Sequence, residues 1–216
     1  MAKAQAHAAC VGVVEHGNSA VLVTIAPGGT FVDRRRVDLT RGLPTHPYHH
    51  EGSWAVGRYV DSPWARAISL SDAIALVERV REAAAAGARD SLDALAANVT
   101  VPVAHIAIRA CPALPATTQE RIADTRAANV ADSVMYREAL ASAAQLRGWS
   151  VYWYDREHVL RDAAAALGGK DIGAFLNAMG RSIGPPWQAK HKLAAAAAIV
   201  VMAGRPMHSD SSLRST

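Results

Sequence analysis

Short apolar segments separated by turn-forming residues dominate the start of the chain. Residues 10–14 (CVGVV) and 20–25 (AVLVTI) are rich in β-branched side chains, and a Gly-Asn-Ser sequence between them is typical of a hairpin turn. After a second turn, residues 30–39 interleave apolar and charged positions, as in a strand at the edge of a sheet. The arginines at 34–36 are expected to be exposed on that edge without binding a ligand. The pattern predicts three consecutive antiparallel strands.

Helical periodicity then alternates with two further strands. Residues 103–110 (VAHIAIRA) form a nearly continuous apolar run, which indicates a buried strand of a parallel sheet, and residues 149–154 predict a fifth strand. A two-part helix interrupted after Gly87 is expected before the fourth strand, and a long helix ending at Leu146 is expected before the fifth. Three more helices are predicted over 155–167, 172–183 and 187–202. Parallel strands alternating with helices indicate right-handed crossovers in an α/β fold.

The whole chain, residues 1–216, is expected to form a single domain. Residues 40–70 are rich in Pro, Gly, His and Trp without a regular period, so a long loop insertion is predicted there, and such loops often carry function. Residues 204–216 are expected to be a flexible tail. Half of the residues are hydrophobic, but much of that half is alanine, which favours helices that pack closely.

The charge and the cysteine content limit the partners and the cellular location that are expected. The net charge of +4 is compatible with a polyanionic partner. Cys10 and Cys111 are too few for a disulfide framework and are predicted to lie too far apart to pair, so free thiols and a cytoplasmic location are expected. The longest apolar run, residues 193–203, is too short to cross a bilayer, and no membrane partner is expected.

Three segments carry a resemblance to a known family. Residues 11–17 (VGVVEHG) are similar to the first strand of the ribonuclease-H-like superfold, and residues 140–159 and 171–198 are similar to its later helices and fifth strand. Within that superfold the order of elements resembles the RuvC and YqgF branch, which contains Holliday-junction resolvases. The resemblance implies a five-stranded mixed sheet, three antiparallel strands followed by two parallel ones, flanked by helices. It also implies action on nucleic acid.

The same resemblance implies a site at the carboxyl ends of the first and fourth strands. There the family gathers several carboxylates around two Mg²⁺ ions. This chain has Glu15 at the first position, Arg109 at the second, and Lys190, His191 and Lys192 where the last helix should supply acids. Glu15 is therefore the expected catalytic acid and a ligand to Mg²⁺ or Mn²⁺. His191 is expected to take part in catalysis, while Arg109, Lys190 and Lys192 would hold phosphate groups.

The sequence HPYHHE at 46–51 is the densest cluster of ionisable residues in the loop. Histidine next to glutamate can serve as an acid, a base or a metal ligand near neutral pH. If the loop folds over the strand ends, His49 and Glu51 would complete a catalytic site with Glu15 and His191, and Glu51 would be a second metal ligand. An ordinary surface loop is the alternative.

Two principal functions are compatible with these features. The first is a nucleic-acid-acting, divergent metal-dependent nuclease, with a second copy of the chain as a further expected partner. The alternative is a catalytically inactive binding or scaffold module of the same fold. A phosphotransferase of the actin-like branch ranks last, because no second glycine-rich phosphate loop is present. The residues do not distinguish DNA from RNA.

Overall fold

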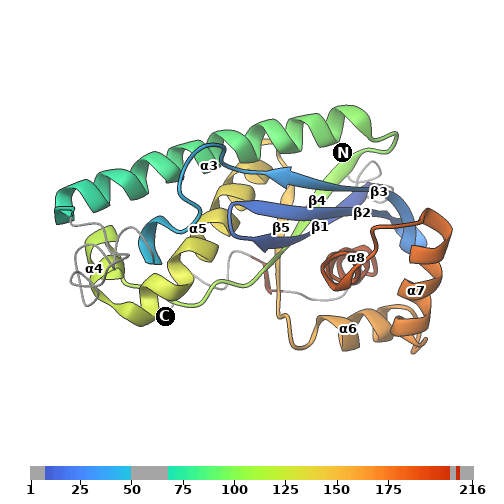
Figure 1. Cartoon of the computed structure of the whole chain (residues 1–216). Coiled ribbons are helices and arrows are strands. Elements are labelled where there is room, and N and C mark those ends of the chain that lie inside the picture. The colour runs from blue at the N-terminus through green and yellow to red at the C-terminus, as the bar shows by residue number, and fades with distance from the viewer. Residues whose placement is uncertain (1–7, 50–67, 205–207, 210–216) are drawn as a thin grey trace.

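A mixed β-sheet forms the centre of the molecule (Figure 1). The computed structural model describes residues 8–49, 68–204 and 208–209. Strands β1 (Ala9–His16), β2 (Ser19–Ala26) and β3 (Thr30–Asp38) form an antiparallel meander, as their turn-separated β-branched runs predict. The short 3-10 turn η1 (Pro27–Gly29) joins the last two of these strands.

Two parallel strands complete the predicted sheet. β4 (Val103–Arg109) pairs in parallel with β1, and β5 (Ser150–Tyr154) pairs in parallel with β4. The order β3-β2-β1-β4-β5, with three antiparallel strands followed by two parallel ones, confirms the predicted ribonuclease-H-like fold class. A two-residue strand, β6 (His208–Ser209), pairs antiparallel with β5, so the segment predicted to be a flexible tail contributes a sixth strand.

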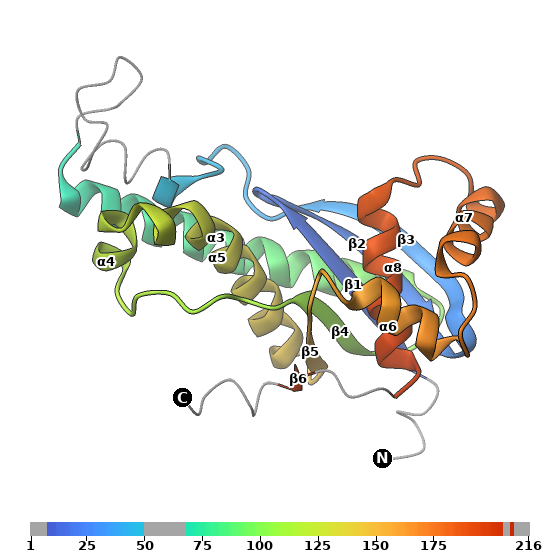
Figure 2. The same cartoon turned by 90° about the horizontal axis from the view of Figure 1, so that it is seen from below.

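Helices cover both faces of the sheet (Figures 1 and 2). The long helices α3 (Leu70–Asn98) and α5 (Thr125–Leu146) pack on the face formed by side chains such as Val11, Val13 and Ile106. Side chains next to these in sequence, such as Cys10 and Ala107, point to the opposite face, as the two-residue period of a strand requires. That face is covered by α6 (Val159–Ala166), α7 (Ile172–Ile183) and α8 (Ala189–Met202).

Helix α8 lies very close to the sheet because both surfaces have small side chains. Its five consecutive alanines, residues 194–198, are all fully buried. A Cβ atom on Gly12 of β1 would lie 1.8 Å from the carbonyl oxygen of Ala194, which is far below a normal contact distance. Glycine at this position therefore permits the close approach of α8 and places the start of that helix beside the end of β1.

Two predicted helices have different boundaries in the structure. α3 is unbroken, so the break predicted after Gly87 is wrong. A Cβ atom there would lie 2.1 Å from the carbonyl oxygen of Leu39, which shows that this glycine serves a close contact. The helix expected to run to Leu146 is divided into α4 (Thr118–Ala123) and α5, because Asp124 caps α5 by accepting hydrogen bonds from two backbone amides.

The last helices also begin later than predicted. α6 starts at Val159, not at residue 155, because the Asp155 carboxylate accepts a hydrogen bond from the Glu157 amide within a preceding turn. α8 starts at Ala189, with the two prolines before it outside the helix. The limits of α7 agree with the prediction.

Cys10 and Cys111 are free thiols, as expected. Within the described ranges, no helix is long and apolar enough to cross a membrane.

Arg34 of β3 has a structural role that was not predicted. Its guanidinium group donates hydrogen bonds to the carbonyl oxygens of Gly184, Pro185 and Pro186, at 2.7, 2.6 and 2.5 Å. These carbonyls belong to the connection between α7 and α8. Arg34 thus holds this connection against the edge of the sheet by hydrogen bonds, whereas the whole arginine run was expected only to be exposed on that edge.

Candidate functional site

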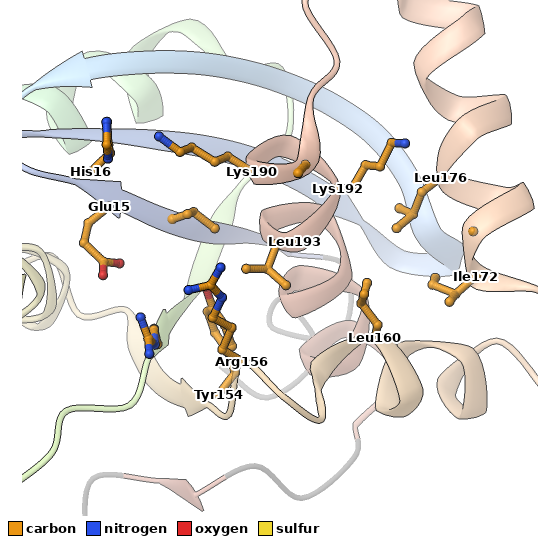
Figure 3. A pocket seen from close by; sticks show the side chains of 14 residues that line it. Glu15, His16, Tyr154, Arg156, Leu160, Ile172, Leu176, Lys190, Lys192 and Leu193 are labelled. Carbon is orange, nitrogen blue, oxygen red and sulfur yellow. The ribbon is translucent and has the colours of Figure 1, made fainter.

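A cavity of about 600 Å³ opens where β1, β4 and β5 end and α8 begins (Figure 3). Parallel strands bring their carboxyl ends to the same edge of a sheet, which is the usual position of sites in α/β folds. The wall combines basic and apolar side chains. Its ionisable residues other than tyrosine are Glu15, His16, Arg109, Arg156, Lys190 and Lys192.

The structure brings together four of the residues that the sequence indicated. Glu15 lies near the end of β1, Arg109 is the last residue of β4, and Lys190 and Lys192 lie in the first turn of α8. The tight packing of α8 on Gly12 carries both lysines to the strand ends. The predicted convergence of distant segments at one edge is therefore present, while the chemical roles of these residues remain predictions.

Glu15 forms a buried ion pair with Arg137 of α5. One carboxylate oxygen, Oε1, accepts hydrogen bonds from Nε and Nη2 of Arg137 at 2.8 and 2.5 Å, and both side chains are less than one-tenth exposed. Arg137 also donates to the carbonyl oxygen of Ala110. The other carboxylate oxygen of Glu15 is buried without a hydrogen-bond partner among the residues described. The charge of Glu15 is thus balanced from within the protein.

The cavity wall does not fit the two-metal site that the resemblance implies. Mg²⁺ and Mn²⁺ prefer several oxygen ligands. Among the described residues of this wall Glu15 is the one carboxylate, and Arg137 occupies one of its oxygens. In the part of the chain that the structure describes, no three His, Cys, Asp or Glu side chains are grouped to hold a metal ion. Glu51, the second expected ligand, lies outside that part.

His191 does not line the cavity, although its neighbours on both sides do. Its Nδ1 atom accepts a hydrogen bond from the backbone amide of Gln188 at 3.1 Å and helps to cap α8, while its ring stacks on Trp187. Burial, together with the positive charge of Arg34, lowers the pKa of His191. The structure thus places His191 as a neutral capping residue, away from the catalytic position that was expected.

Replacing His191 by Ala is expected to lower the free energy of unfolding by about 1 kcal/mol at pH 8, the usual cost of losing a helix cap. Because the folded pKa lies below the unfolded value of 6.5, protonation opposes folding, and the stability contributed by this group is lost as the pH falls through 6.5. The wild type should therefore lose more stability than the variant between pH 8 and pH 5.5. Urea unfolding at both pH values measures this, and equal losses would contradict the capping role.

The described part of the HPYHHE cluster is anchored to α5. The carboxylate of Asp132, which is buried, accepts hydrogen bonds from the backbone amides of Tyr48 and His49 at 2.9 and 3.3 Å. Its Oδ2 atom also lies 3.6 Å from Nδ1 of His46. The side chain of Tyr48 is fully buried and accepts a hydrogen bond from Arg81. His49 is not part of the cavity wall, so its predicted catalytic position is not supported by the geometry.

Three residues that matter at this edge were not predicted. Arg137 could have been found, because the buried positions Val134 and Ala141 lie three residues before it and four after it, on the same face of α5. Tyr154 ends β5 and donates a hydrogen bond from its hydroxyl to the carbonyl oxygen of Val13. Burial raises the pKa of Tyr154, so its hydroxyl stays protonated. Arg156, which is exposed, had no distinguishing sequence signal.

Comparisons with known proteins give little beyond the fold. No family model matches the chain, and no curated protein matches it. Among solved structures, RuvC of T. thermophilus in complex with a Holliday junction substrate is similar over 90% of this chain and 92% of that chain. The sequence identity is 12% and the TM-score is 0.48, too low to carry a conclusion about activity. The fold class follows from the strand order and directions.

Proposed function

We propose that this protein binds nucleic acid through the basic cavity at its strand ends, and that it acts by binding and not by two-metal hydrolysis. The observation that carries the proposal is the charge of the wall. Arg109, Arg156, Lys190 and Lys192 line the cavity, and Glu15, the one carboxylate among its described lining residues, is already paired with Arg137. A cluster of cations attracts phosphate, whereas a metal site needs clustered anions.

The four cations are available to a ligand. None of them forms an ion pair with another residue of the described ranges. They come from three separate segments, the end of β4, the turn after β5 and the start of α8, so they are arranged around the cavity and not along one helix face. Apolar side chains such as Leu160 and Leu193 form the rest of the wall. This arrangement suits several phosphates with sugar or base atoms between them.

The double variant Lys190→Ala with Lys192→Ala is expected to weaken binding of labelled DNA or RNA about tenfold or more at 50 mM salt. The slope of log affinity against log salt should also fall by about two, one for each phosphate contact removed. Fluorescence anisotropy across a salt series measures both quantities. The matched control, Arg126→Ala with Lys170→Ala, removes two exposed cations outside the cavity. An equal loss in the control would assign the binding to overall charge and contradict the proposed site.

Hydrolysis is tested separately from binding. Branched and single-stranded DNA and RNA are incubated with wild type and with Glu15→Gln, in the presence of Mg²⁺, Mn²⁺ or Zn²⁺. The proposal expects no cleavage by either protein. Cleavage by the wild type that Glu15→Gln abolishes would instead establish a metal-dependent nuclease with Glu15 in its mechanism.

A further inference from the structure

A second cavity adjoins the first at Lys192. This second cavity has a volume of about 460 Å³ and lies between the last turn of α7 and the connection to α8. Lys192 lines both cavities, so this side chain lies between the two hollows. Arg181, at the end of α7, and Trp187, just before α8, line the far side. The second cavity therefore continues the first one away from the strand ends.

Basic side chains line both cavities. Arg156 and Lys190 lie in the first cavity, Lys192 lies at the junction, and Arg181 lies in the second. No Asp or Glu lines the second cavity among the residues described. Arg181 is exposed and forms no ion pair with another described residue. We call the cations Arg109, Arg156, Lys190, Lys192 and Arg181 the basic track.

The track does not continue in the opposite direction. A third cavity, of about 750 Å³, shares Arg109 and Arg156 with the first, but Asp155 and Glu157 line it as well and offset these two charges, while the charge of its third arginine, Arg137, is balanced by Glu15. Asp155 and Glu157 are both exposed and would repel a phosphate backbone. The arrangement gives the track a direction, from the ends of β4 and β5 toward the end of α7.

We infer that the basic track binds a single strand of several nucleotides, an inference that rests on the proposed function and specifies its ligand. A single strand can bend to follow successive hollows and place bases in them, whereas the stiff backbone of a duplex cannot. Trp187 lines the second cavity with a half-buried indole, one side of which is already stacked against His191. Its indole is held in place by a hydrogen bond from Nε1 to the carbonyl oxygen of Leu176 and by packing against Gly180. Fixed aromatic rings beside a basic groove are typical of sites for single strands.

The experiment measures how charge reversal in each cavity changes the affinity for short and for long ligands. Binding of a labelled 3-mer, a 15-mer and a 15-base-pair duplex is measured by anisotropy for wild type, Arg181→Glu, Lys190→Glu and Lys170→Glu. Lys170 lies just before α7 and outside both cavities, so its reversal is the matched control for Arg181. Thermal unfolding verifies that each variant is folded.

Arg181→Glu is expected to weaken binding of the 15-mer about five- to tenfold at low salt and to leave the 3-mer unchanged. Lys190→Glu should weaken both ligands, and Lys170→Glu should weaken neither. The duplex should bind the wild type less tightly than the 15-mer. If Arg181→Glu behaves like the control, or if the duplex binds more tightly, the inference is wrong while the proposed function stands. If none of the ligands binds the wild type, both are wrong.

Discussion

Replacing Arg137 by Met is expected to lower the free energy of unfolding by about 3–5 kcal/mol, the usual cost of removing one partner of a buried ion pair. The variant leaves the carboxylate of Glu15 buried without its counter-charge, because Oε1 loses both hydrogen bonds from Arg137 and Oε2 has none among the described residues. The carbonyl oxygen of Ala110 loses its donor as well. Urea unfolding at pH 7.5 measures the loss.

The double variant Glu15→Gln with Arg137→Met serves as the control for charge. Because it removes the stranded carboxylate, it should recover at least half of the stability that Arg137→Met loses. Glu15→Gln alone should be less destabilising than Arg137→Met, since the amide oxygen of Gln can still accept from the guanidinium of Arg137, which also keeps its hydrogen bond to the carbonyl oxygen of Ala110. If the double variant were as unstable as Arg137→Met, the loss would come from packing, and the importance of the ion pair would be disproved.

Replacing Gly12 by Ala is expected to cost about 3 kcal/mol, at the upper end of the range for overpacking a core. The added Cβ atom would lie 1.8 Å from the carbonyl oxygen of Ala194 and 3.2 Å from the amide nitrogen of Ala198. Both are backbone atoms of α8, so no side-chain rotation can relieve the clash and the helix itself must move. Since α8 carries Lys190 and Lys192, nucleic-acid binding should weaken in parallel with stability.

The matched control is Gly173→Ala in the first turn of α7. There the nearest atom to a new Cβ is the side-chain oxygen of Asp171, at 3.2 Å, and the backbone conformation is helical. Alanine is favoured over glycine in a helix by about 1 kcal/mol, which offsets a small side-chain adjustment. Stability within about 1 kcal/mol of wild type is expected. A comparable loss at both positions would show that the close contact at Gly12 is not the cause.

Much of the fold could be predicted because hydrophobic periodicity records which residues face the core. The apolar, β-branched runs of β1 and β2, the apolar run of β4 and the limits of α7 all follow from this record. The errors occur where one residue type is compatible with two different local structures. Gly87 was interpreted as a helix break, but it serves a close contact with Leu39 that only the tertiary structure reveals. Asp124 divides a helix because its carboxylate finds two amides, which residue type alone does not guarantee.

The site was harder to predict, because proximity to the strand ends does not fix the direction of a side chain. Lys190, His191 and Lys192 are consecutive, yet the two lysines line the cavity while the histidine turns back to cap its own helix. Successive helical positions point about 100° apart, so the three side chains leave α8 in different directions, and what packs around the helix decides which of them line the cavity. The pairing of Glu15 with Arg137 required knowing that α5 crosses the end of β1, which the sequence pattern does not specify.

Through the contact between Arg34 and the three carbonyl groups before α8, the outer strand β3 supports the start of α8 and, with it, the proposed binding site. The carbonyls immediately precede the turn that leads to Lys190, and Gly184 and Pro185 line the second cavity, so loss of Arg34 would shift the start of α8 although Arg34 itself lines neither cavity. Natural selection for binding of the proposed ligand would therefore also act on Arg34, although this residue lies away from the ligand.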